Sequence, residues 1–188
     1  MSQLRNTFME ELKDLYDAEK QITKALPKLS KAAENQELKD AFDSHLDETK
    51  KQIERLEEVF GCFDETPKSK RCKGMQGLLE EGEQIIQEEE GDAALICAAQ
   101  KVEHYEIAAY GSLAAWAKLL GETEAAELLG ESLEEEKQAD EKLTQIAEST
   151  INVEESESSG EEEAPSRRLG QRGHTGRQTA GRRSNVTR

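Results

Sequence analysis

The sequence is poor in aromatic residues and prolines, and it holds no long apolar run. Aromatic residues make up 4% of the 188 residues and only three prolines occur, whereas 35% of the residues are charged. This composition disfavours β-sandwiches and barrels and favours long helices. No apolar run approaches the roughly 20 residues that span a bilayer, and the N-terminus lacks the charged-then-apolar pattern of a secretory signal. We therefore expect a cytoplasmic protein that does not enter membranes.

Cysteine is scarce as well. Cys62, Cys72 and Cys97 are an odd set without CxxC spacing, which favours reduced thiols in a cytoplasmic protein over a disulfide framework. A bridge between Cys62 and Cys72 is the weaker alternative. The sequence also has no nucleotide-binding loop and no nucleophile–base signature.

Charge is distributed unevenly along the chain. The net charge is −16, yet residues 167–188 hold seven of the 25 basic residues and no acid, which leaves 18 basic residues against 41 acidic ones elsewhere. A body this acidic does not attract nucleic acid by its general field but does attract cations. Contact with DNA or RNA is expected only through the Arg-rich segment 167–188, and its folding back onto the acidic body is the favoured alternative.

Apolar residues recur at three- and four-residue spacing in four long segments, which predicts four amphipathic helices. They cover residues 3–33, 36–60, 93–120 and 122–150, and a shorter amphipathic segment covers 74–90. Short turns join the first two helices and the last two, so each pair is expected to be an antiparallel hairpin. About 30 residues separate the hairpins, enough to cross the length of a bundle. The sequence thus predicts an all-α, ferritin-like four-helix bundle with one long crossover that contains an extra helix.

The C-terminal segment differs in composition from the rest. Residues 154–163 read EESESSGEEE, and the chain after Pro165 is rich in Arg, Gly, Ser and Thr. Such a segment buries too little apolar surface to fold alone. We expect one bundle domain over residues 1–150 and a disordered, acidic-then-basic tail over residues 151–188.

Carboxylates interrupt the apolar seams of three predicted helices. Glu19 stands between Leu15 and Ile22, and Glu106 stands between Val102 and Ala109. Glu136 and Asp140 take two consecutive steps of the last helix. A carboxylate on a buried seam is costly unless it is paired or bound to a cation.

These interruptions are expected at one height in the bundle. Glu106 and Glu136 each lie 15 residues from the turn near residue 121, or about 22 Å along a helix. Glu19 lies at a matching distance from the turn near residue 35, opposite a polar stretch of the second helix. Helical spacing also pairs Glu103 with Glu106, His45 with Glu48, and Glu136 with Asp140.

Several carboxylates with one imidazole suit two divalent ions, and hard oxygen donors favour iron or manganese over copper. The candidate ligands are Glu19, His45, Glu48, Glu103, Glu106, Glu136 and Asp140. The alternative is that these acids are partly exposed or pair with neighbouring lysines such as Lys20, Lys101 and Lys137. Tyr110, one turn from Glu106, is a candidate for a hydrogen bond to a ligand.

Four stretches closely resemble the YciE/YciF-type ferritin-like family: DLYDAEKQITKALPKLSKAA, HLDETKKQIERLEEVF, AALICAAQKVEHYEIAAYGSL and LLGESLEEEKQADEKLTQIA. The resemblance spans about residues 3–150. It implies a stress-associated bacterial protein, usually a homodimer, with a rubrerythrin-like di-metal centre that includes Glu19, Glu103 and Glu106. The Glu-x-x-His motif of that pattern falls on Thr49 and Gln52 in the second helix. The histidine expected in the last helix falls near Ala139 and Asp140, so His45, Glu48 and Asp140 are the substitutes.

The leading hypothesis is a ferritin-like stress-response protein with a pair of iron or manganese ions in the bundle core. If that pair is redox-active, an oxidase- or peroxidase-like reduction of oxygen or peroxide is expected. The rival hypothesis is a non-enzymatic helical module for dimerisation and interaction, in which the core acids are protonated or linked by water.

Overall fold

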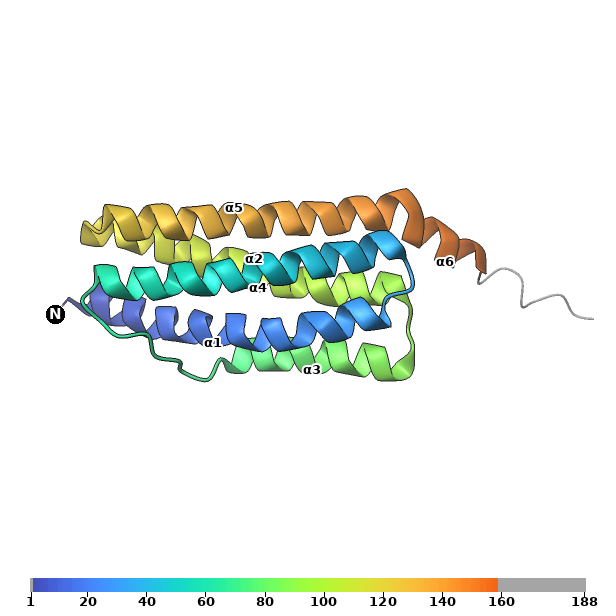
Figure 1. Cartoon of the computed structure of the whole chain (residues 1–188), viewed down its shortest axis with the longest axis horizontal. Coiled ribbons are helices and arrows are strands. Elements are labelled where there is room, and N and C mark those ends of the chain that lie inside the picture. The colour runs from blue at the N-terminus through green and yellow to red at the C-terminus, as the bar shows by residue number, and fades with distance from the viewer. Residues whose placement is uncertain (1, 159–188) are drawn as a thin grey trace, which may run out of the picture.

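The computed structural model describes residues 2–158 of the chain, and every regular element within that range is helical. Four long helices lie side by side (Figure 1). They are α1 (Gln3–Ala32), α2 (Gln36–Cys62), α4 (Asp92–Leu120) and α5 (Thr123–Ile146). Their bounds agree with the predicted ranges to within a few residues, so the four-helix prediction is confirmed.

Local sequence signals set the helix ends. The side chains of Ser2 and Asn35 accept hydrogen bonds from backbone N–H groups in the first turns of α1 and α2. Gly121 ends α4 in the left-handed conformation, with φ of 84°, where a residue without a Cβ avoids a steric penalty. These caps allow both hairpins to turn within two or three residues.

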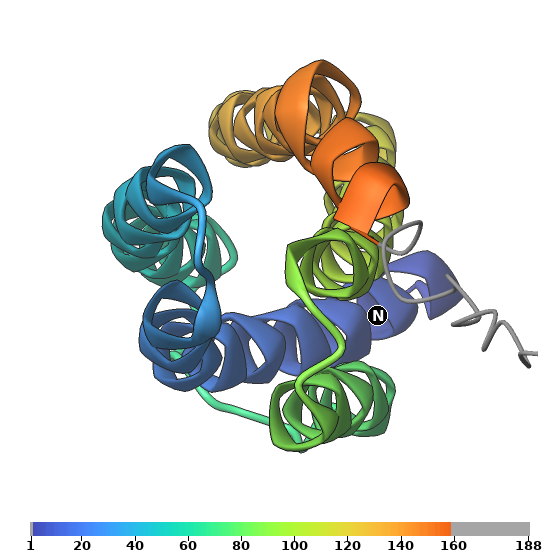
Figure 2. The same cartoon turned by 90° about the vertical axis from the view of Figure 1, so that its right-hand side faces the viewer.

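The crossover between α2 and α4 contains the expected extra helix, α3 (Lys73–Glu88). Around the bundle, α2 packs against α1 and α5, and α4 packs against α5 and α1. The end-on view shows α3 outside this ring, next to α1 (Figure 2), and α3 contacts α4 as well. The groove between α1 and α4 is therefore covered by α3, while the α2–α5 side has no such cover among the described residues.

The helical chain continues past the predicted domain boundary at residue 150. A π-helical turn, η1 (Ala147–Ile151), leads into α6 (Asn152–Ser158). Ile151 is buried, and Glu155 accepts a hydrogen bond of 3.0 Å from the backbone N–H of Ala93 at the start of α4. Residues 151–158 are thus helical and not a disordered tail as predicted, and the rest of the predicted tail lies outside the described residues.

The core is apolar toward both ends of the bundle and polar at its middle. One set of buried apolar side chains includes Phe8, Leu12 and Phe60, and another includes Leu38, Leu95 and Ile151. Between them lie fully buried carboxylates. Within the described residues, none of the helices combines the length and apolarity required to cross a membrane.

Candidate metal centre

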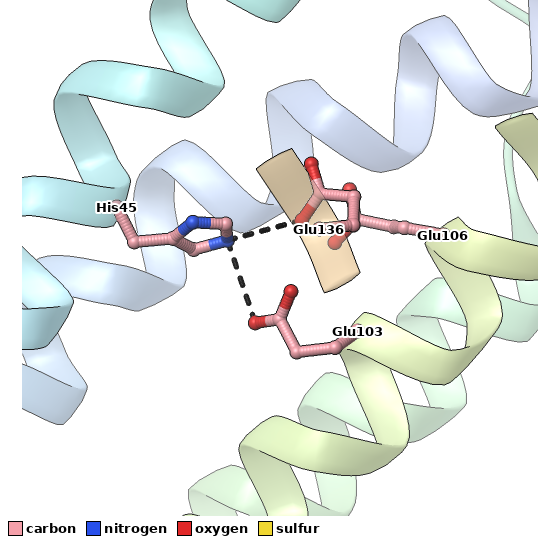
Figure 3. A group of neighbouring side chains, drawn as sticks. All are labelled: His45, Glu103, Glu106 and Glu136. Atoms are coloured by element: carbon pink, nitrogen blue, oxygen red, sulfur yellow. Dashed lines mark ion pairs between the residues drawn. The ribbon is translucent and has the colours of Figure 1, made fainter. Parts of the chain in front are cut away.

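Five ionisable side chains from all four long helices are buried at the middle of the bundle. They are Glu19 of α1, His45 of α2, Glu103 and Glu106 of α4, and Glu136 of α5, and none is more than 6% exposed. Ligand atoms of His45, Glu103, Glu106 and Glu136 all lie within 4.8 Å of one another. Figure 3 shows these four side chains, which come from α2, α4 and α5, pointing toward one another. The expectation that the polar seam positions meet at one height is borne out for these residues.

His45 lies at the centre of the contacts between helices. Its Nε2 lies 3.4 Å from Glu103 Oε1 and 3.6 Å from Glu136 Oε2, the two pairs drawn in Figure 3. Its Nδ1 faces Glu48 Oε2 at 3.5 Å. Both ring nitrogens therefore face carboxylates, two of which are buried and one of which is partly exposed.

Glu19 accepts a hydrogen bond from a phenol on the neighbouring helix α4. The hydroxyl of Tyr110, which is fully buried on α4, donates a hydrogen bond to Glu19 Oε1. Glu19 also interacts with Glu106. The predicted role of Tyr110 as a hydrogen-bond partner of a candidate ligand thus matches the structure.

A second network links the cluster to the surface between α2 and α5. Gln52 Nε2 donates to Glu136 Oε1 and, at 3.1 Å, to Glu135 Oε2. The guanidinium of Arg55 donates two hydrogen bonds of 2.6 Å to the carboxylate of Glu135. Such bidentate pairs fix geometry as well as charge, so they hold α5 in register with α2 at the level of the cluster.

Unsatisfied polar atoms are concentrated in this one place. Among the described residues, every buried side-chain nitrogen or oxygen without a hydrogen-bond partner belongs to the cluster or to Gln52. They are Glu19 Oε2, both nitrogens of His45, Gln52 Oε1, Glu103 Oε2, Glu106 Oε2 and Glu136 Oε2. Each such atom in a protein interior carries a desolvation penalty of about 1–3 kcal/mol. Because these atoms lie close together, their lone pairs are arranged as they would be in a site that binds a cation.

Burial sets the protonation of the metal-free cluster. Desolvation, together with the charge of Glu136, raises the pKa of Glu19 to about 8. Desolvation also raises the pKa values of Glu103, Glu106 and Glu136. For His45, burial lowers the pKa, but Glu103, Glu48, Glu136 and Glu19 together outweigh it and raise the pKa to about 10. Near neutral pH the cluster therefore holds protons, which a bound cation would displace.

Two of the seven candidate ligands lie apart from the buried group. Glu48 contacts His45 but its side chain is 39% exposed. Asp140 is not part of the cluster: it accepts a hydrogen bond from Gln100 and lies 3.5 Å from the exposed His104. One turn beyond Glu136, α5 directs Asp140 toward α4 and not toward the centre. The structure does not bring Asp140 together with the other candidates.

Sequence reasoning missed the roles of Gln52, Glu135 and Arg55. The sequence identifies Gln52 as the residue at the position of a missing histidine, and it gives no sign that the Gln52 amide donates to Glu136. An Arg at position 55 and a Glu at position 135 look like ordinary surface residues in a sequence in which 35% of the residues are charged. The only sequence evidence that positions 55 and 135 are neighbours is their height in the bundle, counted in residues from the turns at the ends of their helices.

Comparisons with known proteins agree with the fold and with the resemblance seen in the sequence. A family profile described as "Domain of unknown function (DUF892)" matches residues 3–155. The protein YciF of Escherichia coli is 48% identical over 157 residues, which cover 81% of this chain and 95% of YciF. The chain is thus similar to YciF over nearly the whole of that protein.

Solved structures give the same result. The crystal structure of the E. coli stress protein YciF matches with a TM-score of 0.75 and 49% identity, covering 78% of this chain and 96% of that one. YcfI from Rhodopseudomonas palustris matches with a TM-score of 0.75, 43% identity and the same coverage. A protein from Xanthomonas campestris, 22% identical with a TM-score of 0.66, covers 84% of this chain and 99% of that one and shares the fold.

Proposed function

The chain belongs to the DUF892 family, and from this premise we propose that it is a stress-response protein that binds two divalent metal ions in the bundle core. The observation that carries the proposal is the set of seven buried nitrogen and oxygen atoms that lack a hydrogen-bond partner. Six belong to Glu19, His45, Glu103, Glu106 and Glu136, and one belongs to Gln52. Bound cations satisfy such atoms in a way that apolar packing does not. The stress role comes from the similarity to YciF, which is described as a stress protein.

Charge balance supports two ions. The four buried carboxylates carry four negative charges when all are ionised, which two divalent cations neutralise. With one divalent cation, two of these carboxyls would have to keep protons, since burial raises their pKa values and an uncompensated buried charge is costly. Ionisation of all four carboxylates therefore favours a pair of ions of charge +2.

The donor set supports iron or manganese. Four carboxylates and one imidazole are mostly hard oxygen ligands, which suit manganese and iron, and no thiol lies among the clustered groups. The cysteine nearest to the cluster in sequence, Cys97, is exposed. Zinc and copper, which favour sulfur or several imidazoles, fit less well.

Each residue would have a distinct task. Glu103, Glu106, Glu136 and His45 would hold the ions, and Glu19, fixed by Tyr110, would close the site from α1. A redox-active pair, when bound, would supply electrons for the reduction of oxygen or peroxide. His45 and Glu48 would retain a proton at the edge of the site, where their side chains meet at 3.5 Å.

Elemental analysis tests the proposal directly. Protein purified without chelator is expected to hold iron or manganese, and metal-free protein is expected to bind about two Mn²⁺ per chain at micromolar concentration in calorimetry. A double variant, Glu106→Gln with Glu136→Gln, should lose this binding while it keeps its helical content. Glu127→Gln with Glu134→Gln, two exposed positions of α5, is the matched control. A folded wild-type protein that binds neither metal would support the rival, a helical interaction module.

A further inference from the structure

A pocket of about 180 Å³ lies between α2 and α5 and ends at the candidate metal centre. Its inner wall includes His45 and Glu103, and its outer part is lined by Ser44, Gln138 and Lys142, which are exposed. Glu48 lies between these two parts, with its side chain 39% exposed and 3.5 Å from His45. The pocket thus joins the surface to two members of the buried cluster.

Small residues keep this passage open. Ala41 and Ala139 line it on the two helices, and neither fills the space as a leucine would at the same step. On the neighbouring turns, Gln52 and Arg55 fasten α2 to α5 through Glu136 and Glu135, which closes the interface there. On the far side of the bundle, α3 covers the groove between α1 and α4.

We propose that divalent cations reach the buried cluster through this α2–α5 pocket, with Glu48 as the first ligand and His45 and Glu103 as the receiving groups. This inference rests on the proposed function, since it names the route to the same site. A partly exposed carboxylate meets a hydrated cation while it is still in contact with solvent. The facing imidazole and the buried Glu103 would then receive the cation, and the protons that they hold in the metal-free protein would be released to solvent.

Two kinds of substitution at the outer end of the pocket should change the rate of cation binding in opposite directions. Lys142 lines the pocket near Glu48, and its positive charge repels an approaching cation. Removing that charge should speed binding, whereas filling the pocket should slow it. Damage to the fold would not produce both effects.

The first experiment fills the passage with Ala139→Phe. Binding and release of Mn²⁺ are followed by stopped-flow competition with a fluorescent chelator. Both rates should fall by about an order of magnitude or more, because access would require the added side chain to move aside. The dissociation constant and the stoichiometry should not change, since a shared route slows both directions equally. Ala108→Phe, at an exposed position of α4, is the matched control and should bind Mn²⁺ at the wild-type rate.

The second experiment is Lys142→Gln at low ionic strength. Its association rate for Mn²⁺ should rise about two- to threefold, an effect that added salt should abolish. Lys118→Gln, at an exposed position near the end of α4, should show no change. Wild-type rates in both Ala139→Phe and Lys142→Gln would overturn the route but leave the metal site intact. Absence of Mn²⁺ binding in the wild-type protein would overturn the proposed function and this inference with it.

Discussion

The amide of Gln52 on α2 donates a hydrogen bond to the carboxylate of Glu136 on α5, in the fully buried middle of the bundle. The same amide nitrogen donates to Glu135, which Arg55 holds from α2. Gln52 is therefore a neutral donor at a point where another acid would face Glu135 and Glu136. Its neutrality limits the repulsion that the metal-free protein must tolerate.

Replacing this amide with an acid tests its role. Gln52→Glu should lower the free energy of unfolding of the metal-free protein at pH 8 by about 3 kcal/mol, since it removes a donor and adds a buried charge. The loss should shrink toward pH 5, where the new carboxyl is protonated and donates again. Urea denaturation at the two pH values measures both effects. Gln145→Glu, exposed on α5, should change stability little, and an equally stable Gln52→Glu protein at pH 8 would contradict this role.

Stability of the metal-free protein should fall as pH rises from 5 to 9. The folded state raises the pKa of Glu19 to about 8, from an ordinary value of 4.5. A group whose pKa is raised on folding stabilises the folded state fully below its unfolded pKa and loses that contribution as pH passes the folded value. The raised pKa of His45, about 10, acts in the same direction. Each proton that the folded state retains gives a slope of up to about 1.4 kcal/mol per pH unit.

Urea denaturation across this pH range, without metal, measures the slope. Glu19→Gln should flatten it, because the amide keeps the hydrogen-bond acceptor for Tyr110 but does not titrate. Glu54→Gln, exposed on α2, should leave it unchanged. Surface acids such as Glu10 and Asp47 have lowered pKa values, so their contributions change at lower pH. A stability that rises between pH 5 and 9 would refute the protonated state of the metal-free cluster.

Periodicity and distance from the turns were sufficient to predict that Glu19, Glu106 and Glu136 meet. A charged residue on an apolar seam is visible in the sequence, and helix rise is constant, so depth follows from counting. Asp140 shows the limit of this reasoning. It keeps helical spacing from Glu136, yet it lies at the edge of the buried face and contacts Gln100. Whether a residue at such an edge points into the core or toward a neighbouring helix depends on the rotation of α5 about its own axis, which the sequence pattern does not fix.

The end of the folded chain was harder to predict for a different reason. The composition of residues 154–163 is typical of a solvated, disordered segment. The structure nevertheless extends the helical chain through α6, where Glu155 contacts the first turn of α4. That contact joins residues 62 positions apart, and local composition carries no information about it.

Loss of the Tyr110 hydroxyl should weaken metal binding as well as the fold. Tyr110→Phe removes the donor to Glu19 Oε1 and should cost about 1–3 kcal/mol of stability. It should also lower the affinity for Mn²⁺ by about tenfold, a size typical when the partner of a ligand is removed. Chelator competition measures the affinity. Tyr105→Phe loses a hydrogen bond to Asp14 outside the cluster and should retain wild-type affinity; equal losses in both variants would argue against a specific role for Tyr110.

Glu155 provides the side-chain acceptor that the start of α4 otherwise lacks. The residue before that helix, Gly91, makes no side-chain cap, and Glu155 Oε1 accepts the N–H of Ala93 at 3.0 Å. A carboxylate at a helix N-terminus also interacts favourably with the helix dipole. Glu155→Ala should therefore lower the free energy of unfolding by about 1 kcal/mol, whereas the exposed neighbour variant Glu154→Ala should have little effect.

A chain ending at residue 150 should lose more stability than the Glu155→Ala variant, because it also lacks the buried Ile151. A chain ending at residue 158 should keep the stability of the full chain in the same urea titration. If the chains ending at 150 and 158 unfold at the same urea concentration, α6 adds nothing to the bundle and residue 150 is the true end of the folded unit.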